Sequence, residues 1–583
     1  MAIKSMRLTF LVRNNLNKDK TIKYTLSVCI SAIFFLYVTG GLILNTDNTY
    51  WIINSFSIDY KQHWVTWLFF QNSPLLQLPL TGNYSYGMGL STTLAANDSI
   101  PLMALASKLM KPFFGLPNQY LGLWIFICFI LQGLFSYKIL EKFIDDKYIL
   151  VISTIFFLIA PVFLFRLSLG HTAMFGHWII LASINMYFSS NRNLLKWLLV
   201  IVVSLLINSY ISSMVLLFFI AFFFKTQVEK RFKFELMNWV YFIGICFFFI
   251  QILPIIGLDI NVSKYYTGGF ANYRTNINSF FDPGATNWQH ASIWSSLLPD
   301  LLGSKSNLSG DYEGFAFLGI GTIALLPICI YSAIKNFRRK INRSLFPIIL
   351  SAVFLLIYSF SNEISLGKEI IFEYNVPKIF KVYTESLRAS GRFIWPVVYL
   401  IYILVFTISY KLITKKVLRI LLTLLLALQI YDSTIPVKDL RESFSTKVYS
   451  VKPEWKLFMK NPIWNKIATK YDNVLLVMPN GWPSKQFLSI SLFASQNSMN
   501  IDSGYHARFN MNKMSEYQDE VITDFLNNKF QTSSIYFFVE YGDTELDLIS
   551  QEIWDKISVS HNKDDLVMEI DGFKIFAPSF FKK

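Results

Sequence analysis

Charged residues and cysteines are both scarce in this sequence. Aspartate, glutamate, lysine and arginine make up 16% of the 583 residues, whereas a soluble protein carries about a quarter. No phosphate-binding P-loop or dinucleotide-binding glycine motif occurs. The four cysteines fall within apolar runs and lack the spacing of a zinc site or a disulfide framework: Cys29, Cys128, Cys246 and Cys329. These absences argue against a soluble, disulfide-stabilised or nucleotide-binding protein.

The sequence has long hydrophobic runs instead. Hydrophobic residues make up 53% of the chain and aromatic residues 17%, and several runs reach the ~20 residues that cross a bilayer as a helix. The first run has no cleavage site after it, so we expect a retained span rather than a signal peptide. Hydropathy predicts a polytopic α-helical membrane protein with about eleven spans, at residues 24–44, 120–137, 148–165, 172–188, 194–208, 209–224, 239–258, 315–334, 345–360, 393–410 and 417–431.

The formal net charge of +15 comes from lysines and arginines that cluster between the apolar runs. Such clusters are typical of cytoplasmic loops, so they indicate topology rather than nucleic-acid binding. The main clusters lie within residues 18–23, 225–233, 338–343 and 411–419. With these inside, the N-terminus is cytoplasmic, and three long loops lie outside, at residues 45–99, 259–314 and 361–392.

The chain divides into two parts. Residues 1–435 form the predicted membrane part, with residues 45–99 as a large first outer loop, whereas residues 436–583 are soluble in composition and lie outside. No internal repeat of the kind found in secondary transporters is visible. In the second part we expect a small α/β domain, with strands at 474–477, 534–539, 566–570 and 573–576 and helices at 515–528 and 546–557.

The first outer loop places charged side chains among tryptophans and phenylalanines. We expect residues 50–70 to form an aromatic helix in the membrane interface, on which Asp59 and His63, four positions apart, share a face. A carboxylate there can act as a general base on an acceptor hydroxyl, or bind a divalent cation together with the imidazole. The alternative is a solvated helix face on which this spacing has no function.

Two other aspartates flank this loop. Asp98 stands just before a short apolar segment, residues 100–110, which we expect to be re-entrant or interfacial. In the sequence Asn-Asp-Ser-Ile-Pro an aspartate is also a natural helix N-cap, so Asp98 is either a second catalytic carboxylate or a cap. Asp47 is better explained as an interfacial cap.

Basic groups gather at the same predicted membrane boundary. Arg166, His171 and His177 surround a glycine turn between two predicted spans, where they would attract phosphate. A snorkelling arginine and a histidine of the helix bundle are the alternatives. Arg388 and Arg392 lie on the outer side against the positive-inside bias, which favours anion binding over membrane anchoring.

A further pair of acidic residues precedes a predicted span in which glycines recur at short intervals. Asp311 and Glu313 would accept hydrogen bonds from sugar hydroxyls, or form the polar rim of a close-packed helix face.

Five motifs together resemble the GT-C superfamily of polytopic glycosyltransferases, in a little-characterised bacterial branch with a C-terminal extracytoplasmic domain. They are DYKQHWVTWLFF (59–70), NDSIPL (97–102), RLSLGH (166–171), YEGFAFLGIG (312–321) and RASGRFIWP (388–396). The resemblance covers the membrane part. It implies that an acidic residue of the first outer loop is the catalytic base and that the donor is a polyprenyl-phosphate sugar.

Mapped onto this sequence, the resemblance makes Asp59 the first candidate base and Asp98 the second. It makes Arg166, His171, Arg388 and Arg392 candidates for the lipid phosphate, beside His63, His177 and Glu313 as further substrate-binding candidates. Some members carry an adjacent acidic pair, but Asp59 is flanked by Ile58 and Tyr60. Whether a divalent cation, Mg²⁺ or Mn²⁺, takes part therefore stays open.

The resulting prediction is a multi-pass glycosyltransferase of a bacterial cytoplasmic (inner) membrane, with its C-terminal domain outside. It would transfer a sugar with inversion to an extracytoplasmic glycan or lipid-linked acceptor, as in surface-polysaccharide or O-antigen modification. A surface-polysaccharide polymerase or ligase is one alternative. A flippase or transporter of lipid-linked sugars is the other.

Overall fold

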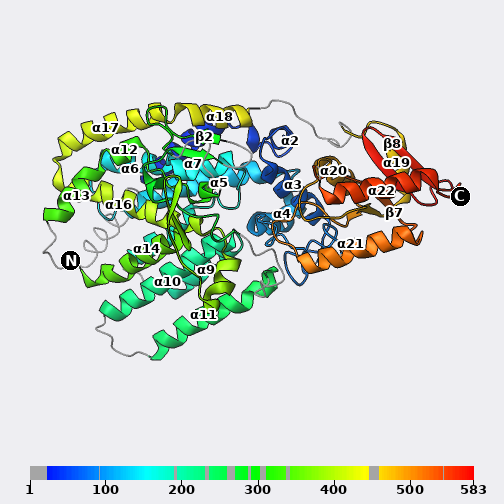
Figure 1. Ribbon diagram of the computed structural model, residues 1–583. Coiled ribbons are helices and arrows are strands. Elements are labelled where there is room, and N and C mark those ends of the chain that lie inside the picture. Colours follow the sequence, from blue (N-terminus) through cyan, green and yellow to red (C-terminus); the bar gives the residue numbers. More distant parts are fainter. Residues whose placement is uncertain are drawn as a thin grey trace, which may run out of the picture.

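The computed structural model describes residues 23–88, 90, 92–189, 193–229, 236–258, 269–286, 291–301, 310–335, 342–445, 458–542 and 544–582. Several residues of the basic clusters and parts of the second outer loop lie outside the described residues. These are Lys18, Lys20, Lys230, Arg231, Lys233, Arg338, Arg339 and Lys340, and residues 259–268, 287–290 and 302–309. In Figure 1 the helices up to α18 form one part of the molecule and the C-terminal sheet with its helices the other.

Five helical segments within the described residues are long and apolar enough to cross a membrane. A sixth is present if α17 (Lys415–Asp432) and α18 (Thr434–Phe444), which meet at 55°, form one span. The chain therefore has the helices of a membrane protein. The five are α5 (Leu121–Leu140), α6 with α7 (Lys147–Leu158 and Pro161–Ser168), α10 (Ser209–Glu229), α11 (Leu236–Ile256) and η7 with α16 (Ser390–Ile394 and Trp395–Leu412).

The expected eleven spans are only partly confirmed, because the other apolar runs form shorter helices of 10–17 residues. Hydropathy counts apolar residues and does not register where a helix begins. Pro347, for example, stands in the first turn of α14, as expected for a residue that cannot sit inside a helix. The shorter helices are Lys23–Thr39, α8 (Trp178–Tyr187), α9 (Leu194–Leu205), α12 and α13 (Ile320–Ile323 and Leu326–Lys335), and η5 with α14 (Arg343–Leu345 and Phe346–Ser359).

The first outer loop is folded into the molecule. The helix expected over residues 50–70 is divided into α2 (Tyr50–Ile53) and α3 (Ile58–Phe70), because Ser57 is extended and its hydroxyl caps α3 by accepting a hydrogen bond from the Asp59 amide at 3.2 Å. Most of α3 is buried, and it packs against α20 (Phe487–Gln496) of the C-terminal domain. The prediction of one continuous helix is therefore wrong, and its aromatic residues face protein rather than lipid. Its place in the membrane interface stays a prediction.

The remaining elements of the membrane part are short. Residues 100–110 begin α4 (Pro101–Phe114), which is not among the candidate spans. The others are η1 (Leu42–Leu44), η3 (Ile277–Phe280), η4 (Asp311–Gly314), η6 (Lys378–Phe380), α15 (Lys381–Ser386), and two antiparallel hairpins, β1–β2 (Gly284–Thr286 and Ala291–Ile293) and β3–β4 (Glu363–Leu366 and Glu369–Glu373).

The C-terminal domain contains a mixed five-stranded sheet in the order β6-β5-β7-β9-β8. The four expected strands are confirmed as β5 (Asn473–Leu476), β7 (Ser534–Phe538), β8 (Leu566–Ile570) and β9 (Phe573–Ala577), and the two expected helices as α21 (Met511–Leu526) and α22 (Glu545–Val559). The short β6 (Asn500–Ile501) and the helices α19 (Ile463–Lys470) and α20 were not expected. β5 runs parallel to β6 and β7, and β9 antiparallel to β7 and β8.

The edge of this sheet is joined to the first outer loop. Ile501 of β6 forms a parallel bridge with Tyr86. The Ile501 carbonyl accepts from the amides of Gly87 and Met88 at 2.9 and 3.0 Å, and its amide donates to the Ser85 carbonyl at 2.9 Å. The loop thus adds a short strand to the edge and holds the C-terminal domain against α3.

Candidate functional site

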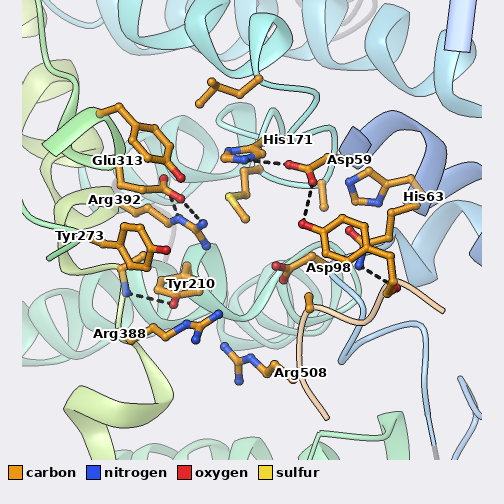
Figure 2. A pocket seen from close by; sticks show the side chains of 18 of the residues that line it. Asp59, His63, Asp98, His171, Tyr210, Tyr273, Glu313, Arg388, Arg392 and Arg508 are labelled. Carbon is orange, nitrogen blue, oxygen red and sulfur yellow. Dashed lines mark hydrogen bonds and ion pairs between the residues drawn. The ribbon is translucent and has the colours of Figure 1, made fainter. Parts of the chain in front are cut away.

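A cavity of about 440 Å³ lies where the first outer loop, the membrane part and the C-terminal domain meet. Figure 2 shows charged side chains from all three directed toward this space. The loop contributes Asp59, Gln62, His63 and Asp98, and the C-terminal domain Trp482, Tyr505, Ala507 and Arg508. The membrane part contributes Leu169, His171, Ala173, Met174, Tyr210, Tyr273, Tyr312, Glu313, Arg388, Ala389 and Arg392.

The start of α3 is fastened to the turn that follows α7. The Ser57 hydroxyl donates to the Leu169 carbonyl at 2.6 Å, and the Tyr60 hydroxyl to the Leu167 carbonyl at 2.7 Å. Gly170, with φ +74°, makes this turn, and a Cβ there would lie 2.4 Å from the Ser57 Oγ. Only glycine suits such a position. The turn therefore brings His171 directly opposite Asp59.

Asp59 accepts hydrogen bonds from two sides. His171 Nε2 lies 3.1 Å from Asp59 Oδ2, and the Tyr505 hydroxyl donates to Asp59 Oδ1 at 3.2 Å. Arg166 Nη1 lies 3.3 Å from His171 Nδ1. Because a guanidinium only donates, Nδ1 accepts and the ring proton is on Nε2, facing Asp59. Both histidine nitrogens are thus engaged, and the Asp59 carboxylate is the member of this pair that can take up a proton.

The electrostatics keep Asp59 ionised and His63 neutral at neutral pH. Burial alone would raise the pKa of the Asp59 carboxyl, but the hydrogen bond from His171 and, to a smaller degree, that from Tyr505 lower the pKa below its ordinary value. Burial lowers the pKa of His63 to about 4, and its Nδ1 has no hydrogen-bond partner within the described part of the chain. The cavity therefore contains a carboxylate base beside an uncharged imidazole.

Asp98 lines the cavity rather than capping a helix. The residue at the N-cap of α4 is Ile100, which makes no side-chain cap, and Asp98 has a left-handed backbone with φ 51°. The cap interpretation is therefore wrong, since Asp98 lies too far before the helix. His506 Nδ1 of the C-terminal domain donates to the Oδ1 of the neighbouring Asn97 at 3.3 Å, which fixes this part of the loop.

A buried ion group forms one wall of the site. Arg166 donates to Glu313 Oε2 at 2.7 Å and to its carbonyl at 2.8 Å, and Arg392 Nε donates to Oε2 at 3.0 Å while its Nη2 pairs with Oε1. Burial would raise the pKa of the Glu313 carboxyl, but Arg392 and Arg166 hold the pKa far below its usual range. Two guanidiniums and one carboxylate leave a net positive charge beside the cavity.

Two further arginines reach the cavity from opposite sides of the domain boundary. Arg388 comes from the chain between α15 and η7, and Arg508 from the C-terminal domain, as Figure 2 shows. Arg508 Nη2 donates to the Ser386 carbonyl at 3.0 Å, which holds it close to the segment that carries Arg388. Together with the ion group they make this side of the cavity cationic.

Two family models match the chain. One, a domain of unknown function (DUF6311), matches residues 28–434, and the other, the DUF6311 C-terminal domain, matches residues 463–578. The chain belongs to the DUF6311 family. No curated protein matches it.

In this DUF6311 protein, seven of the nine candidate residues line one cavity: Asp59, His63, Asp98, His171, Glu313, Arg388 and Arg392. Arg166 is fully buried and reaches the site only through Glu313 and His171. His177 lies elsewhere, with Nδ1 2.7 Å from the Tyr399 hydroxyl and its ring 4.4 Å from that of Trp395. The structure thus gives His177 the surroundings of a bundle histidine and not of a substrate ligand.

Sequence reasoning missed the contribution of the C-terminal domain of the DUF6311 chain. Tyr505 and Arg508 lie in the sequence Gly-Tyr-His-Ala-Arg, residues 504–508. Polar side chains in a segment between two strands are only a weak signal of a functional site. Among the described residues, no group of three or more His, Cys, Asp or Glu side chains is placed to hold a metal ion, and the chemistry below depends on none.

Proposed function

We propose that this DUF6311 protein is a GT-C-type membrane glycosyltransferase that moves a sugar from a polyprenyl-phosphate donor to an acceptor hydroxyl outside the cytoplasm. The observation that carries the proposal is the cavity that holds the ionised Asp59 together with Arg388 and Arg508. Displacement of a phosphate-linked sugar by a hydroxyl needs a base for the hydroxyl proton and a cationic site for the leaving phosphate.

In the proposed reaction the acceptor hydroxyl gives its proton to Asp59 as its oxygen attacks the anomeric carbon. The bond between that carbon and the phosphate oxygen breaks, and its electron pair leaves with polyprenyl phosphate. The products are a glycoside of inverted configuration, polyprenyl phosphate and a protonated Asp59. His171 and Tyr505 act as positioning residues because they hold the carboxylate in one orientation. Asp98, on the same cavity, is the second candidate base.

The structure changes which arginines are best suited to the phosphate. Arg166 and Arg392 both pair with the buried Glu313, so much of their charge is compensated within the protein. Arg388 and Arg508 line the cavity from two parts of the chain, and guanidinium groups bind phosphate oxygens in pairs. We therefore assign the phosphate to Arg388 and Arg508, with the net charge of the ion group adding to the attraction.

The apolar helices supply the environment that a lipid-linked donor needs. We further propose that the chain crosses a bacterial inner membrane about eleven times, counting the shorter helices. The C-terminal domain would then face outward. The acceptor would then be a surface glycan or a lipid-linked precursor of one.

Binding of polyprenyl phosphate, the proposed product, tests the donor site. We expect native mass spectrometry of the purified protein to detect one bound polyprenyl phosphate, and Arg508→Ala and Arg388→Ala each to weaken binding about tenfold or more, because each removes a charge-assisted hydrogen bond of ~1.5–3 kcal/mol. Arg441→Ala is the matched control, since Arg441 is exposed on α18, donates to the Tyr37 carbonyl at 3.1 Å and does not line the cavity. Equal binding by all variants would contradict the assignment.

A further inference from the structure

The segment between α14 and η7 exposes an unusual number of apolar side chains. Every residue of β4 is exposed, and the surface continues through η6 and α15. A two-stranded hairpin is marginal in water even without such exposure. The exposed apolar residues are Leu366, Ile370, Ile371, Phe372, Tyr374, Ile379 (77%), Phe380, Val382 and Tyr383 (63%). We call residues 366–383 the hairpin surface.

The first strand and the turn of the hairpin are held by polar contacts, so the exposure of the hairpin does not come from a loose loop. Arg274 Nη1 donates to Glu363 Oε2 at 2.6 Å. Asn276 binds Gly367 twice, donating to its carbonyl at 2.8 Å and accepting from its amide at 3.0 Å. The Ser365 hydroxyl donates to Asp311 Oδ2 at 3.2 Å. The fixed first strand and turn thus leave the second strand, β4, facing outward.

The hairpin surface is joined to an apolar helix at each end. It follows α14, whose Phe346, Leu350, Phe354 and Ile357 are exposed at intervals of three and four residues and so lie on one helix face. It precedes η7 and α16, which form one of the candidate spans. Both ends of the segment are therefore fixed at helices with apolar outer faces.

We propose that the hairpin surface lies in the membrane interface, against lipid headgroups and the upper acyl chains. Lys368, Lys378 and Lys381 are exposed among its apolar side chains, beside Glu369 and Glu373 of β4. Such lysines bury their stems in lipid while the ammonium groups reach the phosphates, and the glutamates stay in the aqueous headgroup layer. Unpaired strand edges do not occur in the hydrocarbon core, which places the hairpin at headgroup depth rather than deeper. This inference does not depend on glycosyl transfer.

Fluorescence quenching by lipid tests the proposal without any substrate. An environment-sensitive fluorescent amino acid is introduced by codon suppression at Phe372 or Ile379 of the full chain, which leaves the four cysteines unchanged. The variants are reconstituted in nanodiscs whose lipids carry bromine on the upper acyl chain. Leu350 on the exposed face of α14 is the lipid-facing reference, and Val559, an exposed apolar residue of α22 in the C-terminal domain, is the water-facing reference.

We expect quenching at Phe372 and Ile379 close to that at Leu350, with a blue-shifted emission, and no quenching at Val559. Quenching at both hairpin positions no greater than at Val559 would overturn the proposal and point to a protein partner on this surface. Each label is placed on an exposed side chain, and the melting temperature of each variant shows whether the fold is kept.

Discussion

Asp59 is held by side chains from two distant parts of the chain. His171 donates to one carboxylate oxygen and Tyr505 to the other, while Arg166 fixes the tautomer of His171. Each contact favours the ionised carboxylate over its protonated form. The orientation and the ionisation of Asp59 therefore have the same structural cause, and removing one donor should alter both.

Removing the Tyr505 hydroxyl should raise the pKa of Asp59. A hydrogen bond to a carboxylate stabilises the charged form and lowers its pKa, so Tyr505→Phe should move the acid limb of the transfer rate in membrane preparations to higher pH. The rate should thus fall at a higher pH in the variant than in the wild type, and recover at neutral pH where Asp59 is ionised in both.

Tyr541→Phe is the control for this measurement, since the Tyr541 hydroxyl donates to the Met478 carbonyl in the same domain at 2.8 Å and does not line the cavity. An acid limb at the same pH in Tyr505→Phe and wild type would contradict the role given to Tyr505.

Among the elements, η4 and η7 determine where the ion group forms. Gly391 of η7 lies so close to η4 that a Cβ there would come within 2.6 Å of the Gly314 amide nitrogen and 2.7 Å of its Cα. Backbone atoms cannot move aside as a flexible side chain does. This close approach brings Arg392, the next residue in η7, to Glu313 of η4.

Gly391→Ala should separate η4 from η7 and destabilise the protein by about 1–3 kcal/mol, the usual cost of overpacking. The melting temperature of the purified protein measures this loss. Gly244→Ala is the matched control, because no atom lies within 4 Å of a Cβ at Gly244 in α11 and alanine favours a helix by about 1 kcal/mol over glycine. A melting temperature unchanged by Gly391→Ala would contradict this packing.

The elements also show what local sequence patterns can predict. The strands β5, β7, β8 and β9 follow from short runs of β-branched and aromatic residues, and the shared face of Asp59 and His63 from helical spacing. The interruption at Ser57 was missed because the aromatic run continues on both sides of it. The helix expected in the membrane interface became a buried one because its partner, α20, lies more than 400 residues away in the chain.

At the scale of the whole molecule, the cavity exists because the C-terminal domain docks on the first outer loop. The contact between Tyr505 and Asp59 spans 446 residues, and that between Arg166 and Glu313 spans 147. Sequence motifs indicated several groups that line the cavity but not how they meet, and they gave no sign that Tyr505 and Arg508 join them. The pairing of Ile501 with Tyr86 at the sheet edge brings the segment with Tyr505 and Arg508 to the cavity. A two-residue strand such as β6 leaves no recognisable pattern in a sequence.

The most direct test of the central claim is mass spectrometry of surface glycans from four strains: wild type, gene deletion, Asp59→Asn and Asp47→Asn. Asp47 is the matched control, since it accepts from Asn118 at 2.9 Å and does not line the cavity. We predict a mass step of one sugar in the wild type and in Asp47→Asn, and its loss in the deletion and in Asp59→Asn, because removal of a general base costs about 10²–10⁴-fold in rate. A step that survives in Asp59→Asn would contradict Asp59 as the base. Identical glycans in all four strains, or a change in chain length alone, would contradict the glycosyltransferase itself.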